Sequence, residues 1–439
     1  MKNKKGFFRE NIAVGFMLFA LFLGAGNIIF PPLLGQQAGD SIVISMIGFL
    51  ITGVGLPLLA IVAVAKNGGD LQVLANRVNP YFGIIFTSIV YLSIGPFFAI
   101  PRTGAVSYSI GVAPLLSASM QESWIPLFIT TIIFFGITLY LAFNPTKLVD
   151  RIGKILTPAL LIVICLLAAK AFITPMGEIG EAQGPYINNA FGESFVQGYL
   201  TMDVLGALVF GIVIIQALKA RGIKARAEQV KISIFAGIIA AIGLAFVYIA
   251  LAYIGVTSTS AIGIFEDGGQ IISESAKVLY GGAGSIILSA TIILACLTTS
   301  VGLLSANASF FAKILPKFSY QTYLIVFALF SLGVANVGLS SLISISLPVL
   351  LAIYPIAIVL MILSLFGGVF NHSSYVYGIS LFFTALVSLY DGLKQANLEI
   401  VAYGDLLAKL PLYDQSIGWL VPAIIGAIIG YFVQMIVKK

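Results

Sequence analysis

The chain has 439 residues, of which 59% are hydrophobic and only 9% are charged, with a formal net charge of +6. A soluble domain carries roughly 25% charged residues, so this composition argues against a soluble enzyme, a nucleic-acid binder and a disordered scaffold. Long unbroken apolar runs also argue against a β-barrel, whose strands alternate over about ten residues. We expect an all-α polytopic membrane protein.

Twelve apolar runs predict twelve transmembrane helices, since a span needs about 20 apolar residues. The runs lie near residues 11–34, 42–65, 82–110, 126–143, 155–173, 198–217, 232–255, 284–311, 321–337, 341–365, 374–391 and 417–437. The first run is longer than the apolar core of a signal peptide and is interpreted as an uncleaved span. The longest connections, 174–197, 256–283 and 392–416, are too short for a separate domain, so residues 1–439 form one membrane domain.

Lys and Arg favour cytoplasmic loops, so their distribution predicts the orientation. With the N-terminus inside, 18 of the 23 Lys and Arg residues fall on the cytoplasmic side and three, Lys277, Lys394 and Lys409, on the outer side. The remaining two, Arg102 and Lys170, fall within spans. Both termini of this multi-pass protein are therefore expected in the cytoplasm.

Spans 1 and 6 are predicted to be interrupted. Span 1 contains Gly24, Gly26 and Asn27, followed by the pair Pro31-Pro32, and span 6 contains several glycines and Asp203. Gly costs about 1 kcal/mol and Pro about 3 kcal/mol in a helix interior. In a membrane, such breaks are tolerated where they face protein or a water-filled cavity.

The two interrupted spans are five spans apart, which places the two halves of the chain in opposite orientations. Paired interruptions at corresponding positions of two such halves indicate the binding site of a transporter. We therefore expect inverted repeats over about 11–173 and 198–365, with extra helices over about 374–437.

The sequence around these residues resembles the bacterial branched-chain amino acid:cation symporters, the system II carriers. The similarity is most specific at Leu23–Gly35 and extends to Pro101–Gly104, Gly198–Asp203 and Cys296–Gly302. It implies uptake of leucine, isoleucine and valine with Na⁺ or H⁺. It also implies a LeuT-type fold of 5+5 inverted repeats with two additional helices.

A zwitterionic substrate needs donors for its carboxylate and acceptors for its ammonium. Freed N–H groups at the start of the second half of span 1 suit the carboxylate, aided by the positive helix end. Similarity to LeuT-type carriers assigns the donors to this segment, and freed carbonyls of span 6 suit the ammonium. The candidate substrate residues are Gly24, Ala25, Gly26, Asn27, Thr201, Asp203, Leu205 and Gly206. Phe210, Phe97, Phe98 and Tyr108 are candidates for the apolar pocket.

Arg102 and Asp203 carry opposite charges within spans 3 and 6. A charge at the bilayer centre costs about 2.5–3.5 kcal/mol on an insertion scale, so both need a reason to be there. They are expected either to form an ion pair or to gate the site. Asp203 is alternatively the carboxylate that carries the coupling ion or proton.

We expect sodium as the coupling ion, with protons as the rival. Carbonyls near Ala20 and Leu23 lie at the negative end of the first half of span 1. Ala295, Thr298 and Thr299 share one face of span 8, which LeuT-type carriers place beside span 1. Ser300 replaces a threonine if the register is shifted by one. The alternative is that these hydroxyls bond only to their own preceding turn.

Other functions remain open. One is a LeuT-type carrier for another amino acid or a nucleobase, and another is an intramembrane enzyme. An enzyme would need clustered catalytic side chains, but the sequence has one His and two Cys. A channel would be expected to show rings of repeated polar residues. The chain has no Walker motif, which argues against an ATPase of its own. We expect no enzyme activity, no ATPase subunit, no cofactor, and no metal beyond Na⁺.

Overall fold

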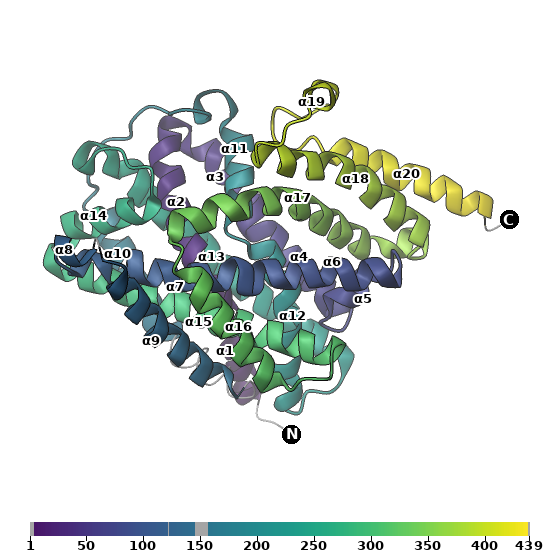
Figure 1. Ribbon diagram of the computed structural model, residues 1–439, viewed down its shortest axis with the longest axis horizontal. Coiled ribbons are helices and arrows are strands. Elements are labelled where there is room, and N and C mark those ends of the chain that lie inside the picture. The colour runs from purple at the N-terminus through teal and green to yellow at the C-terminus, as the bar shows by residue number, and fades with distance from the viewer. Residues whose placement is uncertain (1–3, 122, 145–156, 438–439) are drawn as a thin grey trace.

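The computed structural model describes residues 4–121, 123–144 and 157–437, and throughout these ranges every regular element is a helix (Figure 1). The first ten α-helices are α1 (Lys4–Phe22), α2 (Ala25–Ala38), α3 (Ile42–Leu50), α4 (Leu56–Lys66), α5 (Leu71–Ala75), α6 (Pro80–Leu92), α7 (Ala99–Ser109), α8 (Ala118–Gln121), α9 (Trp124–Ala142) and α10 (Thr157–Ile173). The other ten are α11 (Tyr186–Leu200), α12 (Asp203–Ala220), α13 (Arg226–Ile262), α14 (Gly268–Tyr280), α15 (Gly282–Ile314), α16 (Tyr320–Ala335), α17 (Leu339–Leu365), α18 (Ser374–Gln395), α19 (Val401–Leu407) and α20 (Leu420–Val437). The predicted all-α class is confirmed.

The predicted interruption of span 1 is present between α1 and α2. Gly24 has an extended backbone, with φ −116° and ψ −160°, and α2 begins at Ala25. The Asn27 side chain accepts a hydrogen bond from the Gly24 N–H at 3.1 Å, so this donor is capped inside the protein. Pro31 and Pro32 lie within α2 and do not cause the break.

The interruption of span 6 separates α11 from α12. Met202 adopts the left-handed conformation, with φ 64°, and α12 begins at Asp203. The expected start of this span at 198 is wrong, because α11 already begins at Tyr186. This half-helix contains asparagines, a glutamate and a glutamine, and so it lacks the apolar run used to predict spans. Its polarity is tolerated because much of it packs against protein, chiefly α3 and α2.

A third interruption, which the sequence analysis did not predict, divides span 3. A turn of π-helix, η3 (Ser93–Phe97), joins α6 to α7, and Gly95 within it is non-helical. Pro96 follows directly and has no N–H to donate. Gly95 also packs closely on Asn307 of α15, since a Cβ there would lie 2.3 Å from the Asn307 Oδ1. Such irregular turns are frequent at functional sites.

The structure contains many apolar helices of membrane-spanning length. Within the described residues, nine stretches are long and apolar enough to cross a membrane, and three shorter apolar helices accompany them: Asn11–Phe22, Ile164–Ile173 and Tyr320–Ala335. The count of twelve spans stays a prediction. Six cations counted for the cytoplasmic side lie outside the described residues: Lys2, Lys147, Arg151, Lys154, Lys438 and Lys439. The expected loops 256–283 and 392–416 contain the helices α14 and α19.

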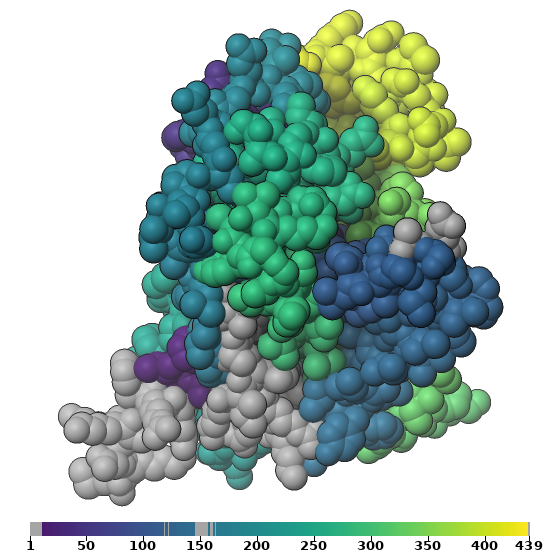
Figure 2. Space-filling model, turned by 90° about the vertical axis from the view of Figure 1, so that its left-hand side faces the viewer, coloured from purple at the N-terminus to yellow at the C-terminus, as the bar shows by residue number. Residues whose placement is uncertain are grey.

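The last helices form an arm at one side of the molecule. α18 packs against α17 and α20, and Figures 1 and 2 show the yellow C-terminal helices at one corner rather than over the centre. Gly426 and Gly430 of α20 lie directly against the backbone of α18. The three interrupted spans lie in the rest of the molecule, where α1, α2, α7, α12 and α15 meet.

Candidate functional site

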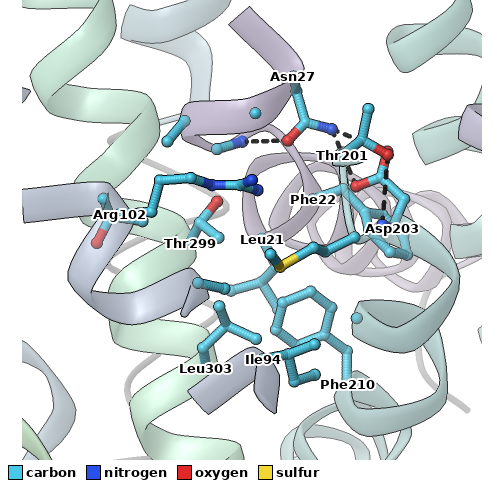
Figure 3. A pocket seen from close by; sticks show the side chains of 17 residues that line it. Leu21, Phe22, Asn27, Ile94, Arg102, Thr201, Asp203, Phe210, Thr299 and Leu303 are labelled. Atoms are coloured by element: carbon cyan, nitrogen blue, oxygen red, sulfur yellow. Dashed lines mark hydrogen bonds between the residues drawn. The ribbon is translucent and has the colours of Figure 1, made fainter. Parts of the chain in front are cut away.

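A small pocket lies where the three interruptions converge (Figure 3). Its walls come from the break in span 1, the start of α7, the break in span 6 and the middle of α15. The lining residues are Leu21, Phe22, Gly24, Ala25, Gly26, Asn27, Ile94, Ala99, Arg102, Thr103, Thr201, Met202, Asp203, Gly206, Phe210, Thr299 and Leu303.

Most of the predicted substrate residues line this pocket. Gly24, Ala25, Gly26, Asn27, Thr201, Asp203 and Gly206 all do, as does Phe210 from the predicted apolar set. Leu205 does not, because it is fully buried on another face of α12. Phe97, Phe98 and Tyr108 are also outside the lining, and Phe97 packs on Phe330 instead.

A buried polar network joins the breaks in spans 1 and 6. The Asn27 Nδ2 donates to both carboxylate oxygens of Asp203, at 2.9 and 2.8 Å. The Tyr248 hydroxyl of α13 donates a hydrogen bond to Asp203 and accepts one from Asn27. The carboxylate therefore has three contacts within the protein, and a carboxylate offers about four acceptor positions. Among the hydrogen bonds of the described residues, one acceptor position is left for a further donor.

Arg102 and Asp203 do not form the predicted ion pair within the described part of the chain. Asp203 is instead bonded to Asn27 and Tyr248, and Figure 3 shows the two charged groups on opposite sides of the pocket. Arg102 is also buried, and its guanidinium lies over the Phe30 ring at 5.6 Å. The sequence revealed two charges within spans but not that Asn27 and Tyr248 are the partners of the carboxylate.

The residues predicted to bind the ion meet beside the pocket. Because the Gly24 N–H is turned to Asn27, the Ala20 carbonyl loses the partner it would have in a continuous helix. It accepts instead from the hydroxyls of Thr298 at 2.7 Å and Thr299 at 3.3 Å. Gly24 lies against the same cluster, since a Cβ there would be 2.9 Å from the Thr299 Oγ1.

The other members of the predicted ion site are placed less uniformly. The Thr298 hydroxyl also contacts the Ala295 carbonyl at 2.9 Å, which is the bond to the preceding turn considered as the alternative. The Leu23 N–H completes α1 by donating to Phe19 at 2.9 Å. The Ser300 hydroxyl is buried without a hydrogen-bond partner among the described residues, and it does not contact Ala20.

The apolar floor of the pocket is composed mainly of residues that the sequence did not single out. Figure 3 shows Leu21, Ile94, Leu303 and Phe210 together below the charged groups. Phe210 is held edge-on against Phe22, with ring centroids 5.6 Å apart. Aliphatic residues in apolar runs carry no signal of their own. The Gly95-Pro96 pair was the available signal that span 3 bends here.

The sequence is similar over its whole length to proteins of known type. A family model described as "Branched-chain amino acid transport protein" matches residues 8–437. The branched-chain amino acid permease BraB of Bacillus subtilis is 47% identical over 98% of this chain and 96% of its own length. The branched-chain amino acid transport system 2 carrier protein of Pseudomonas aeruginosa is 46% identical over 100% and 99%. Permease BrnQ of Escherichia coli K12 is 42% identical over 96% and 95%.

Two solved transporters share the fold. The nucleobase-cation-symport-1 family transporter Mhp1, in a closed conformation with bromovinylhydantoin, has a TM-score of 0.63 and 15% identity, covering 96% of this chain and 91% of its own. MhsT in complex with L-phenylalanine has a TM-score of 0.53 and 16% identity, covering 96% and 98%. The predicted LeuT-type architecture is confirmed by these structures.

Proposed function

The chain belongs to the branched-chain amino acid transport protein family, and on this premise we propose that it imports leucine, isoleucine and valine by symport with Na⁺. Like the permeases and carriers to which it is similar, it is a multi-pass membrane transporter and not an enzyme. The observation that carries the proposal is the pocket at the meeting point of the broken helices, which combines two opposite charges with an aliphatic floor.

In this proposal, the backbone at the two breaks holds the amino acid. The first N–H groups of α2, at Ala25, Gly26 and Asn27, have no acceptor within their own helix and point to the carboxylate. The ammonium lies near Asp203 and the break at Thr201. A branched side chain then packs on Phe210 and its aliphatic neighbours. This arrangement favours an amino acid over a nucleobase, which has no pair of opposite charges to satisfy.

Sodium is proposed to bind at the Ala20, Thr298 and Thr299 cluster, with Ala295 and Leu23 supplying further carbonyls. Na⁺ is a hard cation that prefers several oxygens, and the freed Ala20 carbonyl already faces two hydroxyls here. Protons are the rival, since Asp203 is a titratable group beside the same pocket. The distribution of Lys and Arg supports an orientation with both termini in the cytoplasm, in the bacterial cytoplasmic membrane. We expect the lipid bilayer and the small substrate, and no ATPase subunit, as partners.

The proposal is tested with the purified protein in liposomes. Uptake of radiolabelled leucine is measured with an imposed Na⁺ gradient and, separately, with an imposed pH gradient. We expect accumulation of leucine with the Na⁺ gradient, and competition by isoleucine and valine but not by uracil. No accumulation with either gradient would disprove symport, and accumulation that follows only the pH gradient would make H⁺ the coupling ion.

A further inference from the structure

Arg102 is an incomplete interaction site. Its side chain is only 3% exposed, yet Nε and Nη1 are buried without a hydrogen-bond partner among the described residues. No carboxylate in the described chain lies within ion-pair distance of its guanidinium, which lies over the Phe30 ring. Buried polar groups nearly always have partners, and a buried charge without one is costly. The guanidinium therefore lacks an anion.

The position of this guanidinium shows where the anion belongs. Gly26 lies against the Arg102 Nη2, since a Cβ on Gly26 would be 2.7 Å from it. Gly26 is in the first turn of α2, where the helix end is itself positive and the leading N–H groups are free. A cation beside a positive helix end is unfavourable unless an anion lies between them. Two features that attract negative charge thus meet at one point of the pocket.

The rest of the pocket suits a small ligand with a second, positive group. Asp203 faces the pocket from the opposite side, bonded to Asn27 and Tyr248 and not to Arg102 (Figure 3). Arg102 and Asp203 together leave the pocket with no net charge, which suits a neutral zwitterion. A lone anion, such as a 2-keto acid, would bring its charge near Asp203 with nothing to offer that carboxylate.

We propose that Arg102 is the residue that recognises the ionised α-carboxylate of the substrate, acting together with the N-terminus of α2, while Asp203 accepts the ammonium. This assignment rests on the proposed function and adds a specificity rule to it. The guanidinium can donate two parallel hydrogen bonds to one carboxylate. The site therefore selects amino acids with a free carboxylate, and it rejects amides, alcohols and amines with the same branched side chain.

The test compares leucine with leucinamide, which keeps the ammonium and the side chain but has no carboxylate. Binding to the full-length purified protein is measured by calorimetry and by thermal stabilisation. We expect the unsubstituted protein to prefer leucine by about 100-fold or more, since hydrogen bonds to charged groups are the strong ones. In Arg102→Gln we expect the affinity for leucine to fall by at least about tenfold while the affinity for leucinamide does not fall. The preference for leucine over leucinamide should therefore decrease.

Arg102→Lys is the second variant and separates recognition from folding. It keeps the charge but has no planar fork, so we expect a preference between those of the unsubstituted protein and Arg102→Gln. A purely structural role would weaken both ligands equally in each variant. Equal affinity of the unsubstituted protein for the two ligands would overturn the assignment of Arg102 but not the proposed function. An unchanged preference for leucine in both variants would do the same. If the unsubstituted protein does not bind leucine, the proposed function fails and the assignment fails with it.

Discussion

Gly26 lies where the two broken helices and Arg102 approach one another. A Cβ at this position would lie 2.7 Å from the Arg102 Nη2 and 3.1 Å from the Leu200 carbonyl oxygen. The hydrogen side chain is therefore what lets the guanidinium, the start of α2 and the end of α11 share one small volume. Any larger side chain must displace at least one of them.

We accordingly expect Gly26→Ala to lower leucine affinity by about tenfold, because overpacking a tight site costs about 1–3 kcal/mol. Gly26→Leu should abolish uptake while leaving membrane insertion intact. The control is Gly136→Ala on the exposed face of α9, where an added Cβ meets nothing within 4 Å. Leucine affinity is measured by binding, uptake by the liposome assay, and insertion by the yield of monodisperse protein. Near-normal uptake by Gly26→Leu would contradict the location of the site.

At the scale of helices, the break in span 1 serves both proposed ligands. The turn of the Gly24 N–H toward Asn27 frees the Ala20 carbonyl on one side and the first N–H groups of α2 on the other. A filled ion cluster would hold the end of α1 against α15, and so hold the start of α2 in place. Ion and substrate affinities should therefore depend on each other reciprocally.

Thr298→Ala is expected to raise the Na⁺ concentration for half-maximal uptake by about fivefold or more, because an oxygen partner of roughly 1 kcal/mol is lost. Thr299→Val tests the second hydroxyl with little change of shape. Leucine affinity should fall in parallel at low Na⁺ and recover at high Na⁺. Thr291→Ala is the matched control, since the Thr291 hydroxyl donates to the Ile287 carbonyl of its own helix at 2.8 Å. A full response of both variants to Na⁺ would show that the ion binds elsewhere.

The sequence predicted the helix breaks that contain residues unfavourable within a membrane helix. Gly24 and Asn27 within an apolar run predicted the first break, and Asp203 marked the second. The start of α11 at Tyr186 was missed, because a half-helix packed against protein needs no apolar run. The interruption at Gly95 was missed for a different reason. A Gly-Pro pair alone does not show whether a helix merely bends or is interrupted.

The partners of the charged residues were less predictable than their presence. Arg102 and Asp203 stood out because charges within spans are rare, but pairing them assumed that opposite charges must meet. The Asn27 amide and the Tyr248 hydroxyl satisfy the carboxylate instead. A tyrosine in an apolar span has no distinguishing mark in the sequence, so this contact required the tertiary structure.

At the scale of the whole molecule, the C-terminal arm is separate from the site. No residue of α18 or α20 lines the pocket, and the arm is held by close contacts between backbones. The Ser380 hydroxyl donates to the Ala423 carbonyl at 2.8 Å, and Gly430 lies under Tyr375. The arm should therefore affect stability without affecting recognition.

Gly430→Ala is expected to lower the Tm of the purified protein by about 2 °C or more, because its Cβ would lie 2.6 Å from the Tyr375 carbonyl oxygen. Leucine affinity should stay within about twofold of the unsubstituted value. Gly333→Ala on α16, with nothing near its added Cβ, is the control and should not lower the Tm. A loss of leucine affinity at an unchanged Tm would instead connect the arm to the pocket.

The side chain of Asn27 limits how this pocket can diverge during evolution. One amide accepts a hydrogen bond from the Gly24 N–H through its oxygen and donates hydrogen bonds to Asp203 and Tyr248 through its nitrogen. Aspartate at this position would keep the acceptor, but its carboxylate would face that of Asp203. Leucine would fill the space and leave three polar groups without their hydrogen-bond partner. The residues at positions 27 and 203 therefore constrain each other. A change of substrate specificity is more readily made by substitutions in the aliphatic floor.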